Sequence, residues 1–247
     1  MILLKSSTTI SLQSNMTELS PRLFCAASMV RGCTKIVDIG TDHAYLPAFL
    51  VLNKNAQDVL ACDIGIGPLR NAEKTVEMYS LQNNIKLRIS DGLKEVSEDE
   101  ADEIIICGMG GTLIAEILSA AEWIKRNGMH LILQPMTHSE DVRHFLCKNG
   151  FSVSEEQYVT DNDRVYCCIS ADYTGNSEPL NEGYCYFGKL PVSGETAVRF
   201  IAKRLQMLET KTEALEKADP ENVILPKLRE IRKYYEERMQ CDCTGNL

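Results

Sequence analysis

Between Lys35 and Gly150 short apolar runs alternate with longer amphipathic stretches, and this alternation restricts the fold more than any other feature of the chain. The apolar runs, each about as long as a buried strand, lie at 35–40, 59–63, 86–90, 103–108 and 130–135. The stretches with helical spacing lie at 44–55, 68–82, 112–126 and 139–150. Strands that alternate with helices predict an α/β fold, with a parallel sheet covered on both faces. Such sheets bind ligands beyond the carboxyl ends of their strands, near the point where the strand order reverses.

The segments 151–159 and 164–173 follow each other without a helix, so we expect them to form a closing antiparallel pair. After a loop at 174–194, the spacing becomes that of a heptad seam, which predicts an antiparallel helical hairpin. Asp219-Pro220 predicts the break, with the aspartate as cap and the proline opening the second helix. Pro226 must then lie in the first turn of that helix or delay its start. The predicted seam residues are Val198, Ile201, Leu205, Leu208, Leu215, Ile224, Leu228, Ile231 and Tyr235.

The length of 247 residues suits one large α/β domain with a small appendage. We expect residues 1–15 to be a disordered extension, 16–175 to form the sheet domain, and 176–247 to be the linker and hairpin. No apolar run reaches the roughly 18 residues that a spanning helix needs, and the opening segment lacks a signal-peptide core. These features predict a cytoplasmic protein that does not enter a membrane.

The net charge of −9 weighs against nucleic acid as a partner, but the charge is unevenly distributed. Residues 195–240 contain ten Lys and Arg against nine Asp and Glu, a net charge of +1, and the rest of the chain carries −10. The acidic character therefore belongs to the first two-thirds of the chain, which weakens the objection to nucleic acid without removing it.

The ten cysteines include no C-x-x-C pair, and several of them stand inside apolar segments, where a reduced cysteine behaves as a small hydrophobe. Without an export signal we interpret them as cytosolic thiols. Cys241 and Cys243 together would make only half of a zinc site, so no metal site is predicted.

The first predicted strand contains Asp38 and ends in a turn with Gly40, which lets a ligand approach the backbone. A dinucleotide fingerprint needs three glycines, and here its positions are Gly40, Asp42 and Tyr45. This argues against NAD or FAD. An aspartate in the turn would repel a pyrophosphate but not a cation, and S-adenosylmethionine is a ligand with cationic sulfonium and ammonium groups.

Further polar or glycine-rich turns follow the next predicted strands. Asp63 ends the second strand, where a carboxylate accepts hydrogen bonds from ribose hydroxyls. Asp91-Gly92 ends the third and suits an adenine amino group, and Gly108-Met109-Gly110 ends the fourth. Aspartates at strand ends also commonly cap helices, so each alone is a weak signal, but together they favour an S-adenosylmethionine site.

Several of these segments are distinctive beyond the general cofactor pattern: DIGTDHAYLP (38–47), CDI (62–64), SDGL (90–93), CGMGGTLIAEIL (107–118) and LILQP (131–135). With LSPRL (19–23), they resemble the bacterial tRNA (adenine-22-N1)-methyltransferase family from about Leu19 to Asp172. The resemblance implies a Rossmann-like class I methyltransferase fold with a C-terminal coiled coil. It also implies S-adenosylmethionine as donor, tRNA as partner, and methylation of N1 of adenine 22. Met136 stands where the family often has asparagine, so an amide role there is not carried over.

Adenine N1 has a free lone pair, so the chemistry needs positioning more than a general base. We expect Asp42 to stabilise the charge that develops on the methylated base, with Tyr45 as stacking or hydrogen-bonding partner. The alternative is that Asp42 caps the following helix and Tyr45 belongs to the core. The expected cofactor-binding residues are Arg22, Asp38, Gly40, His43, Asp63, Ile64, Asp91, Gly92, Gly108, Met109 and Gly110.

Cationic side chains of the hairpin are candidates for contacts with tRNA phosphates, although such charges are as often simply solvated. The candidates are Lys203, Arg204, Arg229 and Lys233. Arg22 suits either the cofactor or RNA. Two other functions stay open: a methyltransferase for a small molecule or protein, and a non-catalytic protein that recruits a partner through the hairpin. No protein partner is implied.

Overall fold

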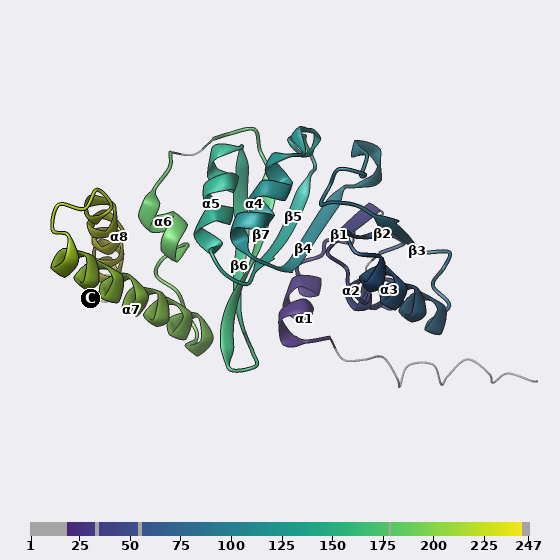
Figure 1. Ribbon diagram of the computed structural model, residues 1–247, viewed down its shortest axis with the longest axis horizontal. Coiled ribbons are helices and arrows are strands. Elements are labelled where there is room, and N and C mark those ends of the chain that lie inside the picture. The colour runs from purple at the N-terminus through teal and green to yellow at the C-terminus, as the bar shows by residue number, and fades with distance from the viewer. Residues whose placement is uncertain (1–18, 33–34, 54–55, 178, 244–247) are drawn as a thin grey trace, which may run out of the picture.

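The computed structural model describes residues 19–32, 35–53, 56–177 and 179–243, so the predicted extension 1–15 lies outside the described residues (Figure 1). Seven strands form one sheet in the order β3-β2-β1-β4-β5-β7-β6. The strands are β1 (Lys35–Ile39), β2 (Asp58–Asp63), β3 (Ile85–Ile89), β4 (Glu103–Met109), β5 (His130–Pro135), β6 (Phe151–Asp161) and β7 (Arg164–Tyr173). Neighbours from β3 through β5 pair in parallel, and β7 runs antiparallel to both β5 and β6. The parallel sheet and its closing antiparallel pair are thus confirmed.

Helices cover both faces of the sheet, because alternate residues of its strands are apolar on both sides. Ile104 and Ile106 of β4 pack with α4 (Gly111–Ser119) and α5 (Ser139–Lys148). Ile105, between them, faces the other core, with α1 (Pro21–Ser28), α2 (Tyr45–Leu52) and α3 (Ile66–Met78). The central strands therefore read as nearly continuous apolar runs.

Several helices differ from the sequence-based expectation, and no helix was predicted where α1 lies. The helix predicted over 112–126 ends at Ser119, because Ala121 leaves the helical region and a 3₁₀ turn, Glu122–Ile124, brings Ile124 into the core. In the segment predicted as a loop, α6 (Glu182–Phe187) forms. The Asn181 side chain caps it by accepting from the Tyr184 amide at 2.8 Å.

The hairpin consists of α7 (Glu195–Ala218) and α8 (Leu225–Cys243). Its core joins both helices to α6 and the linker through Phe187, Leu190, Ile201, Leu208, Leu228 and Ile231. Val198 and Ile224 are exposed, so their place in the predicted seam is wrong, and Ala197 and Leu225 are buried instead. Asp219 ends α7 rather than capping α8, and α8 begins only at Leu225. Pro226 lies in its first turn, where the missing N–H costs little.

None of the helices in the described part of the chain is both long and apolar enough to cross a bilayer.

Candidate active site

The predicted turns meet at the carboxyl ends of β1, β2, β4 and β5, here called the catalytic edge. The strand order reverses between β1 and β4, which is where open α/β sheets bind ligands. Gly40 (φ +79°) and Gly108 (φ +80°) have left-handed backbones that favour glycine. A Cβ on Gly40 would lie 2.3 Å from the Met109 methyl carbon. The missing side chain thus lets the two turns come into contact.

Two carboxylates, those of Asp38 and Asp63, lie at the ends of β1 and β2 next to these turns. Asp38 is 4% exposed, and burial raises its pKa to about 6, with the negative charge of Asp63 acting in the same direction. Asp63 Oδ1 accepts from the Gly65 amide at 2.9 Å, and Oδ2 accepts from the Asp42 amide at 3.3 Å. Because a carboxylate has about four acceptor positions, Asp63 keeps lone pairs for ligand hydroxyls. The backbone therefore presents a fixed acceptor at the catalytic edge.

The turn between β1 and α2 presents a second set of predicted residues. Asp42 (φ +48°) and Ala44 (φ +54°) both have left-handed backbones. Ala44, not Asp42, occupies the N-cap of α2, and Tyr45 is 38% exposed, so the capping and core alternatives are both wrong. The Asp42 side chain is 65% exposed and lies 3.6 Å from His43 Nε2. The rings of His43 and Tyr45 stack at 5.1 Å with an 8° interplanar angle, which gives a flat aromatic surface beside a carboxylate.

Arg22 reaches the catalytic edge from α1. Its Nη1 donates to Gln134 Oε1 at 3.3 Å, and its Nε lies 3.4 Å from Asp161 Oδ2. Gln134 is fully buried and also accepts from the Gly108 amide at 3.2 Å. Gln134 and Asp161 were not predicted as site residues, although Gln134 stands in the LQP segment. Through them Arg22 is held against the Gly108 turn.

Other predicted residues lie farther out. Ile64 is exposed directly after β2, and Asp91 is exposed and paired with Lys94. Gly92 (φ +60°) packs against Ile117, and a Cβ placed on Gly92 would lie 2.9 Å from the Ile117 Cγ2. The Met136 amide donates to the Met109 carbonyl at 2.8 Å, so Met136 joins the site through its backbone.

The four predicted RNA-binding side chains do not share one environment. Lys203 is exposed on α7, whereas Arg229 pairs with Glu216 at 2.8 Å and Lys233 lies 3.7 Å from Glu237. Arg204 is only 11% exposed and contacts Glu140 of α5. The Arg204 guanidinium thus already has partners inside the protein, so we do not include it among the cations proposed to bind RNA.

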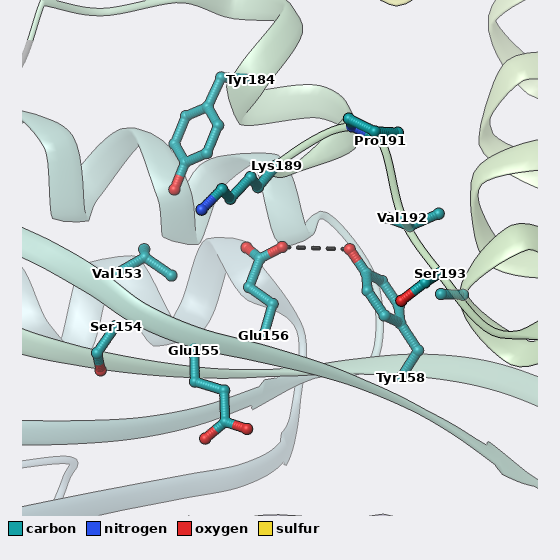
Figure 2. Close-up of a pocket in the computed structure, with 11 residues that line it drawn as sticks. Val153, Ser154, Glu155, Glu156, Tyr158, Tyr184, Lys189, Pro191, Val192 and Ser193 are labelled. Carbon is teal, nitrogen blue, oxygen red and sulfur yellow. Dashed lines mark hydrogen bonds between the residues drawn. The ribbon is translucent and has the colours of Figure 1, made fainter. Parts of the chain in front are cut away.

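A cavity of about 290 Å³ lies between β6 and the segment that leads into α7 (Figure 2). Its lining includes Glu156, Tyr158, Tyr184 and Lys189. Tyr158 donates to Glu156 Oε2 at 3.2 Å, and Glu156 Oε1 accepts from buried Arg143 at 2.6 Å. These internal bonds already occupy Glu156, and the cavity lies apart from the catalytic edge.

Among the residues that the structure describes, no group of three or more His, Cys, Asp and Glu side chains is arranged to hold a metal ion. Seven cysteines of this part are buried free thiols. The side chains of Cys241 and Cys243 lie outside the described ones.

The comparisons with known proteins agree with this arrangement. A family model described as a methyltransferase domain matches residues 19–169. The tRNA (adenine(22)-N(1))-methyltransferase of Bacillus subtilis is 37% identical over 169 residues, which cover 68% of this chain and 71% of that protein.

Solved structures match over more of the chain. The B. subtilis m1A22 tRNA methyltransferase TrmK superposes with a TM-score of 0.74 at 28% identity, covering 90% of this chain and 96% of that one. M. capricolum TrmK, solved with S-adenosyl-homocysteine, gives a TM-score of 0.70 at 28% identity and covers 91% and 100%. The chain belongs to the tRNA (adenine(22)-N(1))-methyltransferase family.

Proposed function

We propose that this protein transfers a methyl group from S-adenosylmethionine to N1 of adenine 22 in tRNA. The observation that carries the proposal is the exposed Asp42–His43–Tyr45 turn, tied by the Asp42 amide to Asp63 at the catalytic edge. Related support comes from the B. subtilis enzyme of that activity and from M. capricolum TrmK, which was solved with the product of the donor.

The residues at the catalytic edge fit a cationic nucleoside donor. Carboxylates at the ends of β1 and β2 favour positive charge, and the close turns at Gly40 and Gly108 expose backbone to a ligand. We assign ribose binding to Asp63, and the rest of the donor site to the other predicted residues around it. S-adenosylmethionine supplies an electrophilic methyl group when bound.

In the reaction, the N1 lone pair of adenine forms the new bond to the methyl carbon as the carbon–sulfur bond breaks. The bonding electrons go to sulfur, which becomes a neutral thioether, and the positive charge passes to the base. The Asp42 carboxylate stabilises this charge, and the stacked His43 and Tyr45 rings offer a surface for an unstacked adenine. No proton needs to be removed before the attack.

We assign tRNA phosphate binding to one side of α7 rather than to the whole hairpin. Arg199, Lys203 and Lys211 are exposed there at spacings of four and eight residues, and within the described chain they have no carboxylate partner. Four cations of α8, in contrast, are paired with acidic side chains: Lys227 with Glu182, Arg229 with Glu216, Arg232 with Glu209 and Glu236, and Lys233 with Glu237. The fifth, Arg238, lies over the Tyr234 ring. An unpaired cation can neutralise a tRNA phosphate and release the counterions held there, whereas a paired cation must first give up its carboxylate.

The α7 assignment predicts a difference between two matched triple variants. Replacing Arg199, Lys203 and Lys211 with alanine should weaken tRNA binding at least about tenfold at low salt and reduce the salt slope by about 2 to 3. The same charge change on α8, at Arg229, Arg232 and Lys233, should have a much smaller effect. Filter binding across a salt series measures the Kd for tRNA and its salt slope in each variant. An equal loss of tRNA affinity in the two variants would contradict the assignment.

The function is tested with two tRNA transcripts that differ only at position 22. We expect labelled S-adenosylmethionine to methylate the transcript with adenine at that position and to leave the one with guanine unlabelled. Nuclease digestion should recover the label as N1-methyladenosine. Equal labelling of both transcripts, or label on neither while donor binding persists, would instead favour a methyltransferase with another substrate.

A further inference from the structure

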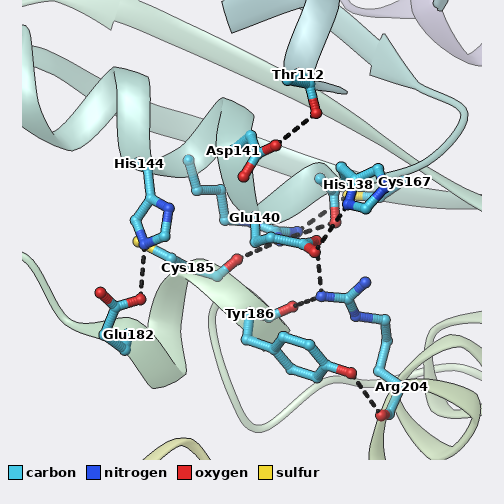
Figure 3. A network of polar contacts seen from close by, with 12 residues as sticks. Thr112, His138, Glu140, Asp141, His144, Cys167, Glu182, Cys185, Tyr186 and Arg204 are labelled. Atoms are coloured by element: carbon cyan, nitrogen blue, oxygen red, sulfur yellow. Dashed lines mark hydrogen bonds and ion pairs between the residues drawn. The ribbon is translucent and has the colours of Figure 1, made fainter. Parts of the chain in front are cut away.

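Arg204 of α7 is held on two sides by the sheet domain and the linker. Its Nη2 donates to Glu140 Oε2 of α5 and to the Tyr186 carbonyl of α6, each at 2.9 Å (Figure 3). The guanidinium carbon lies 3.7 Å from the centroid of the Tyr186 ring, and the Tyr186 hydroxyl donates to the Arg204 carbonyl at 3.0 Å. Two hydrogen bonds and one cation–π contact thus fix a side chain that costs rotamer entropy to order, and the Tyr186 hydroxyl also binds the Arg204 backbone. An arginine on a solvated helix face would not need so many contacts within the protein.

Glu140, the partner of Arg204, lies in the first turn of α5, next to the catalytic edge. Burial acts to raise the pKa of Glu140, but the charge of Arg204 and the hydrogen bonds outweigh it and hold the pKa below its ordinary value. The carboxylate is therefore ionised at neutral pH, and its contact with Arg204 is charge-assisted. Glu140 Oε1 also lies 3.4 Å from His138 Nδ1.

His138 connects Glu140 to the turn after β4. Its backbone is left-handed (φ +51°), and a Cβ on Gly111 would lie 2.0 Å from its carbonyl oxygen. The next residue of α4, Thr112, donates to Asp141 Oδ2 at 2.7 Å (Figure 3). The first turns of α4 and α5 are thus fixed to each other, directly beyond the Gly108–Gly110 turn. Contacts run without a gap from α7 to the catalytic edge.

Other polar contacts attach the linker and α8 to the sheet domain independently of Arg204. Arg143 is fully buried, and donates from Nε to Glu156 at 2.6 Å and from Nη1 to the Cys185 carbonyl of α6 at 3.0 Å. Glu182 of α6 accepts from Lys227 of α8 at 2.9 Å and lies 2.8 Å from His144 Nε2 of α5. Removing Arg204 should therefore leave the hairpin folded and attached.

From these contacts we propose that Glu140 and Arg204 are positioning residues that fix the direction of α7 relative to the catalytic edge. This inference rests on the proposed function, because it assumes that tRNA docked on α7 must deliver its adenine to that edge. Without the ion pair between Glu140 and Arg204, tRNA still binds the cations of α7, but its target base is held less accurately. Small misplacements of a reacting group slow catalysis strongly while changing affinity little.

The test compares Arg204→Ala and Glu140→Gln with the wild-type protein, using the full chain and a tRNA transcript with adenine 22. Both variants should lower kcat at saturating tRNA about tenfold or more. The Kd values for tRNA and for S-adenosylmethionine should stay within about threefold of wild type, since the residues that make those contacts are unchanged. Arg204→Lys keeps the charge that faces Glu140 and should recover part of kcat.

Glu122→Gln is the matched control, because Glu122 is an exposed carboxylate in an ion pair with Lys125, away from α5 and α7. It should keep the wild-type kcat, and thermal unfolding should show that every variant is folded at the assay temperature. An unchanged kcat in both test variants would overturn the inference, as would a loss fully explained by weaker donor or tRNA binding. If the wild-type protein does not methylate this tRNA at all, the proposed function fails first, and the inference fails with it.

Discussion

Replacing Asp63 with alanine is expected to weaken S-adenosylmethionine binding about 100-fold, since two charge-assisted hydrogen bonds are worth roughly 3 kcal/mol together. In the structure the carboxylate is held by the amides of Gly65 and Asp42, so it faces a ligand in one fixed orientation. Alanine removes the acceptor of the ribose hydroxyls, and it also releases the Asp42 amide. Isothermal titration calorimetry with the donor measures the change directly.

Asp58→Ala is the matched control for this prediction. Asp58 is the exposed first residue of the same strand, at the end opposite the ligand. The Asp58→Ala substitution removes the same charge as Asp63→Ala, and we expect the affinity for the donor to stay unchanged. Wild-type affinity in Asp63→Ala would show that the donor does not bind at the end of β2, and an equal loss in both variants would point to a general effect of charge.

The positions of the strand-end residues were predictable because each depends on local spacing alone. An apolar run followed by Asp or Gly places that residue at the carboxyl end of a parallel strand, so Asp38, Gly40 and Asp63 lie as expected. The helices between the strands were predictable for the same reason, with errors at their ends, but α1 and α6 were not predicted. The end of α4 at Ser119 and the start of α8 at Leu225 depend on tertiary packing, which local spacing does not record.

Residues whose role depends on distant partners were not predictable. Gln134 bridges Arg22 and Gly108, which are 112 and 26 residues away from it in the sequence, and no local pattern records such a contact. Arg204 is a second example, because by spacing it is one more cation of a charged helix. Its burial follows from Tyr186 of α6, a helix in a segment whose Gly, Pro, Asn and Ser content predicts a loop.

Replacing Asp42 with asparagine is expected to lower kcat for tRNA methylation about 100-fold, the usual effect of removing one preorganised electrostatic contact from a transition state. The carboxylate stands beside the surface assigned to the adenine, and the charge that it stabilises is absent before methyl transfer. The loss should therefore be in kcat, with little change in the Kd for tRNA. Single-turnover kinetics at saturating donor and tRNA separate these two quantities.

Asparagine is the informative substitution because it tolerates the left-handed backbone of Asp42 (φ +48°), where alanine would add strain. It also keeps the amide N–H that donates to Asp63 Oδ2, so the donor site is preserved. The Kd for S-adenosylmethionine should accordingly match wild type in the same variant. A single-turnover rate within about threefold of wild type would show that another group stabilises the developing charge. The His43→Ala variant would then test whether the stacked His43–Tyr45 surface, rather than the carboxylate, carries the catalytic effect.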